Sequence, residues 1–330
     1  MNVGDRVGVY RLTQAFSNVG GGQSEWAFAE RGGNSYFIKR FLKPTYPVDG
    51  GPGSERGRAR KREECERFER HHRAIQQLLK PLSASGGNLV VTRDFFRHGA
   101  HYFKVTERID REPLALNQIA ALPLADITSL MIAVAGSLRI LHRNRLVHGD
   151  VKPDNVLLTR SSAAAYGAKL IDFDNCFPSG SPPVPDEMVG DPAYYSPEMM
   201  AYLTGGASAP LTQASDVFAL ALVFSQYLTG RLPVGKHPGY LAESVLRGGV
   251  VEFPRPAAAG PIVDLMGRMA LREPEARPDV GEVWTRLKAI RGAVVKGLLP
   301  DGRSASPSPG GAPQLRGKLL EQSRKKDRSR

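Results

Sequence analysis

Alternating, strand-like patterns fill the first hundred residues of this chain, and helical patterns replace them from Leu114 onward. The stretch SEWAFAERGGNSYFIKRFL contains two such strands joined through Gly32-Gly33, which predicts a hairpin. NLVVTRDFFRHGAHYFKVTERI adds two more strands, whereas ITSLMIAVAGSLRILHRN spaces its apolar residues as an amphipathic helix does. Strands first and helices later indicate an α+β chain with two lobes.

A charged helix is predicted among the early strands. Between Arg58 and Leu79, the apolar residues Phe68, Ile75 and Leu78 recur at near-helical spacing. The segment before this helix, KPTYPVDGGPGSERG, is rich in Pro and Gly and is long for a loop in a compact domain. The first lobe is therefore expected to combine its strands with one helix.

Length and composition indicate a globular protein with a large core. The chain has 330 residues, of which 41% are hydrophobic and 24% are charged. It contains no run of 18 apolar residues, and its first residues lack the apolar centre of a signal peptide, so we expect no membrane span. The two cysteines, Cys65 and Cys176, lack metal-ligand spacing and indicate a reducing compartment. These features predict a cytoplasmic protein.

The positive charge of the chain is concentrated at its end. The formal net charge is +12, and the stretch ASPSPGGAPQLRGKLLEQSRKKDRSR carries much of the excess among Pro, Ser and Gly. This composition cannot bury enough apolar surface to order itself, so we predict a disordered basic tail over 293–330. Such a tail either aids solubility or contacts acidic partners, nucleic acid or anionic lipid. Because the charge lies in the tail, nucleic acid is not favoured as the main partner.

A cluster of polar residues lies near the middle of the chain, in the stretch LVHGDVKPDNVLL. The apolar segments at its two ends are typical of short buried strands, so the polar residues between them are expected on a loop held by the core. A loop anchored in this way commonly carries chemistry. Its polar residues are His148, Asp150, Lys152, Asp154 and Asn155.

A glycine-rich segment, Gly20-Gly21-Gly22, precedes the predicted hairpin, and Lys39 lies inside the second strand of that hairpin. Glycines let a backbone approach a ligand closely and direct its N–H groups at phosphate oxygens. Each feature also has a simpler explanation, since a glycine segment can be only a turn and a strand lysine can extend to the surface. Together they suggest a nucleotide site.

The ordered set of motifs resembles a eukaryotic-type (Hanks-type) serine/threonine protein kinase, over about residues 8–291. The chain is identified as a divergent member of this family, and its many Ala, Arg and Gly residues suggest a bacterial source. The motifs that carry the resemblance are Gly20-Gly21-Gly22, Tyr36-Phe37-Ile38-Lys39, His148-Gly149-Asp150, Asp172-Phe173-Asp174, the segment from Gly190 to Glu198, the segment from Ser215 to Leu220, and Arg277-Pro278.

The resemblance implies a two-lobed fold and a phosphoryl-transfer reaction. Residues 1–109 would form a small lobe with an antiparallel sheet and one helix, and residues 110–292 a larger, mainly helical lobe. The implied activity is transfer of the γ-phosphoryl group of Mg-ATP to Ser or Thr hydroxyls of a protein substrate. Asp150 would accept the proton of the hydroxyl, Lys152 would steady the γ-phosphate, and Asn155 and Asp172 would hold Mg²⁺, with Mn²⁺ as an alternative.

Further residues are assigned to the nucleotide by the same resemblance: Val19, Gly20, Gly21, Gly22, Lys39, Glu69, Glu107, Ile109 and Leu157. Glu107 and Ile109 would bond adenine through their backbone groups. Glu69 is our choice for the helix glutamate that pairs with Lys39. Glu66 is a second candidate, and the apolar register of the helix places His71 at the expected position.

Several positions depart from the family pattern: Ser24, Phe37, Gly149, Asp174 and Asp191. Gly149 replaces the arginine that receives an activation-loop phosphate, so switching by that route is not expected. A pseudokinase that binds nucleotide or serves as a scaffold is therefore one alternative. A small-molecule kinase of the aminoglycoside or choline type is another, although Lys152 and the pairing of Glu198 with Arg277 favour a protein kinase. We expect His148 to hold the loop and His71 and His72 to face solvent.

Overall fold

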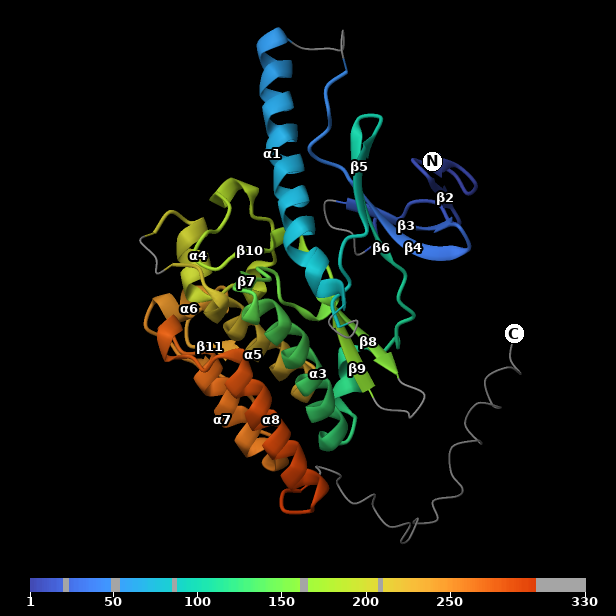
Figure 1. The fold of residues 1–330 in the computed structure, drawn as a ribbon. Helices are drawn as coiled ribbons and strands as arrows, with labels where there is room; N and C mark the ends of the chain where they lie inside the picture. The colour runs from blue at the N-terminus through green and yellow to red at the C-terminus, as the bar shows by residue number, and fades with distance from the viewer. Residues whose placement is uncertain (20–23, 49–53, 85–87, 161–165, 207–209, 301–330) are drawn as a thin grey trace, which may run out of the picture.

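Two lobes of different secondary structure make up the molecule, with the sheet-rich lobe on one side and the helical lobe on the other (Figure 1). The computed structural model describes residues 1–19, 24–48, 54–84, 88–160, 166–206 and 210–300. The predicted phosphate-binding residues Gly20, Gly21 and Gly22 and most of the predicted tail lie outside the described residues. The predicted two-lobed α+β architecture is confirmed.

The small lobe is built on one antiparallel sheet with strand order β1-β2-β3-β4-β6-β5. The predicted hairpin is confirmed, because Arg31 pairs with Asn34 across a two-residue turn. Gly32 and Gly33 have φ angles of 58° and 78°, which suits glycine in a tight hairpin turn. The strands are β1 (Arg6–Val7), β2 (Tyr10–Leu12), β3 (Ser24–Arg31), β4 (Asn34–Phe41), β5 (Asp94–His98) and β6 (His101–Glu107).

Helix α1 (Glu55–Leu79) lies along this sheet (Figure 1). It begins three residues before the predicted Arg58, because the Ser54 side chain accepts a hydrogen bond from Gly57 N and caps the helix. Cys65 and Phe68 pack against aromatic residues of the sheet: Phe41, Phe95 and Tyr102. A second cluster, which includes Val7, Ile38 and Val105, fills the opposite face of the sheet.

The large lobe is organised around two buried helices, α3 (Leu124–Arg143) and α5 (Gln213–Thr229). Helix α3 is long and apolar enough to cross a membrane by length and composition alone, and its buried residues line the main hydrophobic core. The remaining helices are α2 (Leu116–Ala120), α4 (Pro197–Leu203), α6 (Leu241–Leu246), α7 (Gly260–Met269) and α8 (Val280–Val295). A short strand pair, β11 (Val234–Gly235) with β12 (Val251–Glu252), lies among them.

The last helix corrects one predicted boundary. We placed the start of the disordered tail at 293, but α8 continues through Val295 and packs against α3. Val294 is buried in the main core, and Leu299 packs against the same cluster. The boundary at 293 is therefore wrong. The apolar residues at the end of the helix extend the folded lobe past Gly292.

Short strands frame the polar loop in the middle of the chain, as predicted. Strand β7 (Leu146–Val147) precedes the loop and pairs with β10 (Phe177–Pro178). Strand β8 (Val156–Arg160) follows the loop and pairs with β9 (Tyr166–Leu170). Leu170 also forms a bridge with Leu89, just before β5, so this hairpin is tied to the small lobe. The loop is thereby fixed where the two lobes meet.

Candidate active site

Asp216, near the start of α5, anchors the backbone of the polar loop. Its carboxylate accepts hydrogen bonds from His148 N at 2.7 Å and Gly149 N at 3.0 Å, and lies 3.0 Å from His142 Nε2. The side chain of His148 is fully buried, and its Nε2 atom lies 3.1 Å from the carbonyl oxygen of Ile171. His148 therefore holds the loop in place, as expected from the sequence.

The three predicted catalytic residues meet on this loop. Asn155 Nδ2 donates to the carbonyl oxygen of Asp150 at 2.7 Å and to its Oδ2 at 2.8 Å. Lys152 Nζ lies 2.8 Å from the same Oδ2 atom. The Asp150 carboxylate is thus held in one orientation by an amide and an ammonium group.

The backbone explains why Gly149 stands before Asp150. Gly149 has a φ of +78°, and a Cβ atom added there would lie 2.4 Å from the carbonyl oxygen of Asn175. A side chain at this position would therefore clash with the backbone of Asn175, the residue directly after the Asp172-Phe173-Asp174 element. The arginine found in the family pattern is excluded by this close approach.

Asn175 holds the segment between β10 and α4 through hydrogen bonds to Val189. Its Nδ2 donates to the carbonyl oxygen of Val189 at 2.6 Å, and its Oδ1 accepts from Val189 N at 3.2 Å. Arg67 on α1 lies 3.2 Å from Glu187 in the same segment. Asp191, which departs from the family pattern, accepts from Ala193 N and caps a short turn. The segment between β10 and α4 is thus held by hydrogen bonds and an ion pair between protein groups.

A buried ion pair completes the frame of the large lobe, as the motifs predicted. Arg277 donates to the two carboxylate oxygens of Glu198 at 2.7 Å and 2.8 Å. The Ser215 hydroxyl donates to the same carboxylate at 2.9 Å. These contacts tie α4, α5 and the segment before α8 together beneath the loop.

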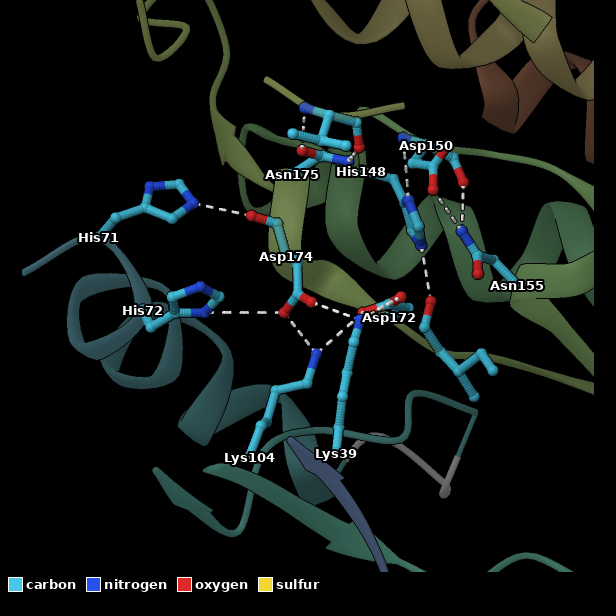
Figure 2. Close-up of polar contacts among 12 residues, drawn as sticks. Lys39, His71, His72, Lys104, His148, Asp150, Asn155, Asp172, Asp174 and Asn175 are labelled. Atoms are coloured by element: carbon cyan, nitrogen blue, oxygen red, sulfur yellow. Dashed lines mark hydrogen bonds and ion pairs between the residues drawn. The ribbon is translucent and has the colours of Figure 1, made fainter. Parts of the chain in front are cut away.

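Two lysines of the small lobe, on neighbouring strands, point toward Asp172 and Asp174 of the large lobe (Figure 2). Lys39 on β4 is the direct cross-strand partner of Lys104 on β6. Like charges in this arrangement repel each other and destabilise a sheet unless anions neutralise them. Two aspartates from the large lobe, Asp172 and Asp174, do so.

These four side chains form one network. Lys39 Nζ lies 3.1 Å and 2.9 Å from the two Asp172 oxygens and 2.7 Å from Asp174 Oδ2. Lys104 Nζ lies 2.9 Å from Asp172 Oδ1 and also donates to Asp174 Oδ1. Each lysine therefore contacts both aspartates, and we call this set the lysine–aspartate network. It is the main charged contact between the β4–β6 strand pair and the Asp172-Phe173-Asp174 element.

Burial and charge act in opposite directions on this network. Burial opposes the charge of Lys39, but the carboxylates of Asp172 and Asp174 outweigh it and raise the pKa of Lys39. Burial likewise opposes ionisation of Asp172, but Lys104 and Lys39 hold its pKa well below the ordinary value. For Asp174, burial and the neighbouring Asp172 raise the pKa, and the two lysines more than offset both. The network pairs two cations with two anions.

The helix contributes imidazoles to this site and no glutamate. We predicted that Glu69 pairs with Lys39, which is wrong: Glu69 Oε1 accepts a hydrogen bond from the Tyr102 hydroxyl at 2.9 Å, and Lys39 is held by the two aspartates. His71 and His72 do not face solvent as expected. His71 Nε2 lies 2.7 Å from the carbonyl oxygen of Asp174, and His72 is buried with Nδ1 3.6 Å from Asp174 Oδ1. The rotation of α1 turns the histidines toward the site and Glu69 toward the sheet.

The predicted adenine-binding residues lie at the edge of the small lobe. Strand β6 ends at Glu107, and within the described residues the N–H of Ile109 donates to no protein acceptor. Leu157 lies half-buried on β8. Val19 is exposed, and its carbonyl oxygen accepts from Trp26 Nε1 at 2.9 Å. These backbone groups and apolar surfaces suit a flat, uncharged ring.

A planar aromatic surface adjoins these residues. The rings of Trp26 and Phe37 stack with centroids 5.8 Å apart. Phe37 is the bulky residue that departs from the family pattern above adenine.

The residues present fit a magnesium ion. Both hydrogen bonds of the Asn155 side chain described above use its Nδ2, so its Oδ1 oxygen is the atom offered to a cation. Asp172 supplies a carboxylate and has a φ of 59°, a left-handed conformation that costs energy for a residue with a side chain. No group of three or more His, Cys, Asp or Glu suited to a metal occurs among the described residues. One carboxylate and one amide match Mg²⁺ that is held mainly through nucleotide phosphates.

Lys104 and Asp174 are the residues of this site that sequence reasoning did not assign. Lys104 gave a signal, since it is a charged residue inside the apolar run of HYFKVTE. Asp174 was noted as a departure, but its partners lie on other elements. Their joint role depends on the pairing of β4 with β6.

Comparisons with known proteins agree with this geometry. The family model of the protein kinase domain matches residues 58–284, more than half of the chain. The chain is 34% identical over 172 residues to U-box domain-containing protein 33 of Arabidopsis thaliana, a match that covers 48% of this chain and 19% of that protein. It is 29% identical over 221 residues to serine/threonine-protein kinase PkaB of Streptomyces coelicolor, covering 64% of this chain and 48% of PkaB.

A second relative from the same bacterium, serine/threonine-protein kinase PkaA, is 27% identical over 230 residues, which cover 68% of this chain and 39% of PkaA. The chain thus spans less than half the length of these relatives. The family match begins at residue 58, after Lys39, and includes Lys104, Asp150, Asp172 and Asp174. The chain therefore belongs to the protein kinase family.

Proposed function

We propose that this chain is an ATP-dependent serine/threonine protein kinase that transfers the γ-phosphoryl group of Mg-ATP to hydroxyls of protein substrates. The observation that carries the proposal is the orientation of Asp150. Asn155 and Lys152 hold its carboxylate on a loop that Asp216 pins to the core. The names of the two Streptomyces relatives support the serine/threonine class.

Each loop residue has a role in this reaction. Bound ATP supplies the phosphoryl group, and Mg²⁺ neutralises charge on its oxygens. Asp150 orients the substrate hydroxyl and accepts its proton, a contribution worth about 10²–10⁴-fold in rate. Lys152 places a cation beside Asp150. Asn155 and Asp172 are the residues that would hold Mg²⁺, or Mn²⁺ in its place.

The nucleotide would lie between the small lobe and the loop. Lys39 supplies a cation for its phosphates, and the backbone of Glu107 and Ile109 supplies hydrogen bonds for its base. Gly20, Gly21 and Gly22 belong to this proposal from the sequence alone.

A pseudokinase is the alternative that one observation favours. Asp172 is held by two lysines, so the residue proposed for the metal already has partners within the protein. The intact set of Asp150, Lys152 and Asn155 favours turnover, because nucleotide binding alone does not require an oriented base beside a cation.

We further propose that the protein is a divergent, cytoplasmic member of the family from a bacterium. Cys65 and Cys176 are both buried free thiols, which suits a reducing compartment. The Streptomyces relatives and the abundance of Ala, Arg and Gly support a bacterial source. The basic residues of the tail would meet acidic partners.

Intact-mass analysis after incubation with Mg-ATP and a generic acceptor such as myelin basic protein tests the proposed activity. The wild-type chain should phosphorylate itself or the acceptor on Ser or Thr, whereas Asp150→Asn should not. Asp154→Asn is the matched control, since Asp154 is exposed on the same loop. Equal transfer by Asp150→Asn and the wild type would contradict the assigned role of Asp150. Binding of ATP without transfer to either acceptor would favour the pseudokinase.

A further inference from the structure

Lys39 lacks the helix carboxylate that the family resemblance led us to expect. Among the described residues, its carboxylate partners are Asp172 and Asp174, both from the large lobe. Helix α1 instead presents His71 and His72 to this region (Figure 2). Some other group must therefore orient Lys39 when Asp172 turns to a metal ion.

We propose that Asp174, balanced by the buried Lys104, is the positioning residue that orients Lys39 for the nucleotide phosphates. Asp174 contacts Lys39 at 2.7 Å and binds Lys104 through its other oxygen. The proposal rests on the proposed kinase function, because it assigns a working position to Lys39.

The charge balance explains why Lys104 accompanies Asp174. A second carboxylate beside Asp172 would repel it at this short range, and a single lysine cannot neutralise both. Lys104 supplies the second cation from the strand position directly opposite Lys39. Its side chain is only 7% exposed, so it would be a costly residue to bury without carboxylate partners.

Helix α1 retains its link to Lys39 through Asp174. His71 lies 2.7 Å from the backbone carbonyl of Asp174, and His72 lies against its carboxylate. His72 is itself fixed by stacking on Phe95, with ring centroids 4.9 Å apart. A shift of the helix would therefore move Asp174, and Asp174 would move Lys39.

Asp172 and Asp174 have different roles in this proposal. Asp172, which we propose for the metal, has a strained left-handed backbone, whereas Asp174 lies in a 3₁₀ turn, Phe173–Asn175, without a positive φ. When Asp172 binds the metal, Asp174 and Lys104 still hold Lys39. An aspartate at position 174 is thus accommodated without backbone strain.

A purely structural role makes a different prediction, and a double variant separates the two. Lys104→Met leaves one carboxylate unbalanced, and Asp174→Asn leaves one lysine unbalanced. The double variant Lys104→Met/Asp174→Asn restores the charge balance and lacks the group that orients Lys39. Exposed matched controls are Lys61→Met on α1 and Asp186→Asn in the segment after β10.

Three quantities should be measured on the full chain: the thermal midpoint without nucleotide, the dissociation constant of ATP with and without Mg²⁺, and the rate of transfer. Each single variant should lower the midpoint, and the double variant should regain most of that loss. Asp174→Asn and the double variant should both bind ATP more weakly and lose about 10²-fold in kcat/KM, because Lys39 is misplaced. The controls should match the wild type.

A rescue variant tests the link to the helix. Adding His71→Glu to the double variant returns a carboxylate from α1 to the vicinity of Lys39, and should recover at least tenfold of the lost kcat/KM and of the ATP affinity. Full ATP affinity and transfer in the double variant would overturn the proposal. So would a midpoint in the double variant that is no higher than in the single variants.

Failure of the proposed function has a separate signature. A wild-type chain that binds ATP without transfer would refute the kinase proposal. The midpoints and ATP affinities of the variants would still decide whether Asp174 orients Lys39.

Discussion

The polar loop and the lysine–aspartate network both lie where the two lobes meet, and they differ in how closely they follow the family pattern. The loop keeps Asp150, Lys152 and Asn155 in mutual contact and is fixed by Asp216 from the core. The network keeps Lys39 and Asp172, but its remaining members are Asp174, which departs from the family pattern, and Lys104, which lies outside the motifs.

This difference follows from what each region must satisfy. The loop residues are neighbours in sequence and share one anchor, so their geometry is set locally. The network joins two strands and the segment after β9, and it can be satisfied by any set of charges that balances in that space. A phosphate-binding lysine can therefore keep its place while its partners change.

Asp172→Asn is expected to have the largest effect on turnover, since this residue belongs to the network and is also proposed to hold Mg²⁺ together with Asn155 of the loop. It should lower the rate of transfer by about 10³-fold, a loss typical of removing one electrostatic contact to a reacting group. It should also lower the thermal midpoint, because Lys39 and Lys104 would share one carboxylate. Steady-state kinetics against Mg²⁺ and a thermal melt measure the two effects.

The exposed Asp186→Asn serves as the control and should change neither quantity. A variant at Asp172 that keeps its activity would remove this residue from the metal site.

Asp216→Ala should have the largest effect on stability, because it removes the anchor that holds the polar loop to the core. It leaves the buried N–H group of His148 and the partly buried N–H group of Gly149 without their acceptor, and each unsatisfied donor costs about 1–3 kcal/mol. We expect a loss of about 2–6 kcal/mol in the free energy of unfolding, measured by urea denaturation. A change below about 1 kcal/mol would show that the loop is held by its flanking strands alone.

Low pH should lower the stability of the fold beside the lysine–aspartate network, because His72 is buried there as a neutral imidazole. Burial lowers the pKa of His72 to about 3, although the Asp174 carboxylate acts in the opposite direction. The folded protein therefore keeps this imidazole neutral, whereas the unfolded chain protonates it below about pH 6.5. The contribution of His72 to the free energy of unfolding is fully present above that pH. It is lost as the pH falls toward 3, with a loss of about 2 kcal/mol at pH 5.

Urea denaturation at pH 7 and pH 5 measures this effect. His72→Leu should reduce the difference between the two pH values by about 2 kcal/mol. His98→Leu, at an exposed position on β5, should leave the difference as in the wild type. If both variants behave alike, charges other than His72 control the acid sensitivity.

Asn175→Ala should have the smallest effect and shows whether the segment before α4 depends on its amide. The variant loses two hydrogen bonds to Val189, worth about 1 kcal/mol each. Amide hydrogen exchange should become faster over residues 185–191, and the rest of the large lobe should keep its protection. Unchanged exchange there would mean that Arg67 and the turn at Asp191 hold this segment without Asn175.

Much of the fold could be predicted from pattern alone. The hairpin of β3 and β4, the helix that became α1, the strands β5 and β6, and the anchored loop are each encoded by residues close together in sequence. The pairing of Glu198 with Arg277 was also predicted, from two separate motifs, and is present. The end of α8 was missed, because Val294 and Leu299 gain their stability from packing against the core.

The sequence by itself determined the two-lobed architecture and the position of the polar loop, because strand periodicity and helix periodicity are local properties, and the family resemblance of its motifs selected Asp150, Lys152 and Asn155 on that loop. Only the tertiary structure decided the partners of Lys39. That choice depends on the register of β4 against β6 and on the rotation of α1, which bring Lys104 to Lys39 and turn Glu69 away. Buried charges must balance in three dimensions, and no single segment of the chain carries that balance.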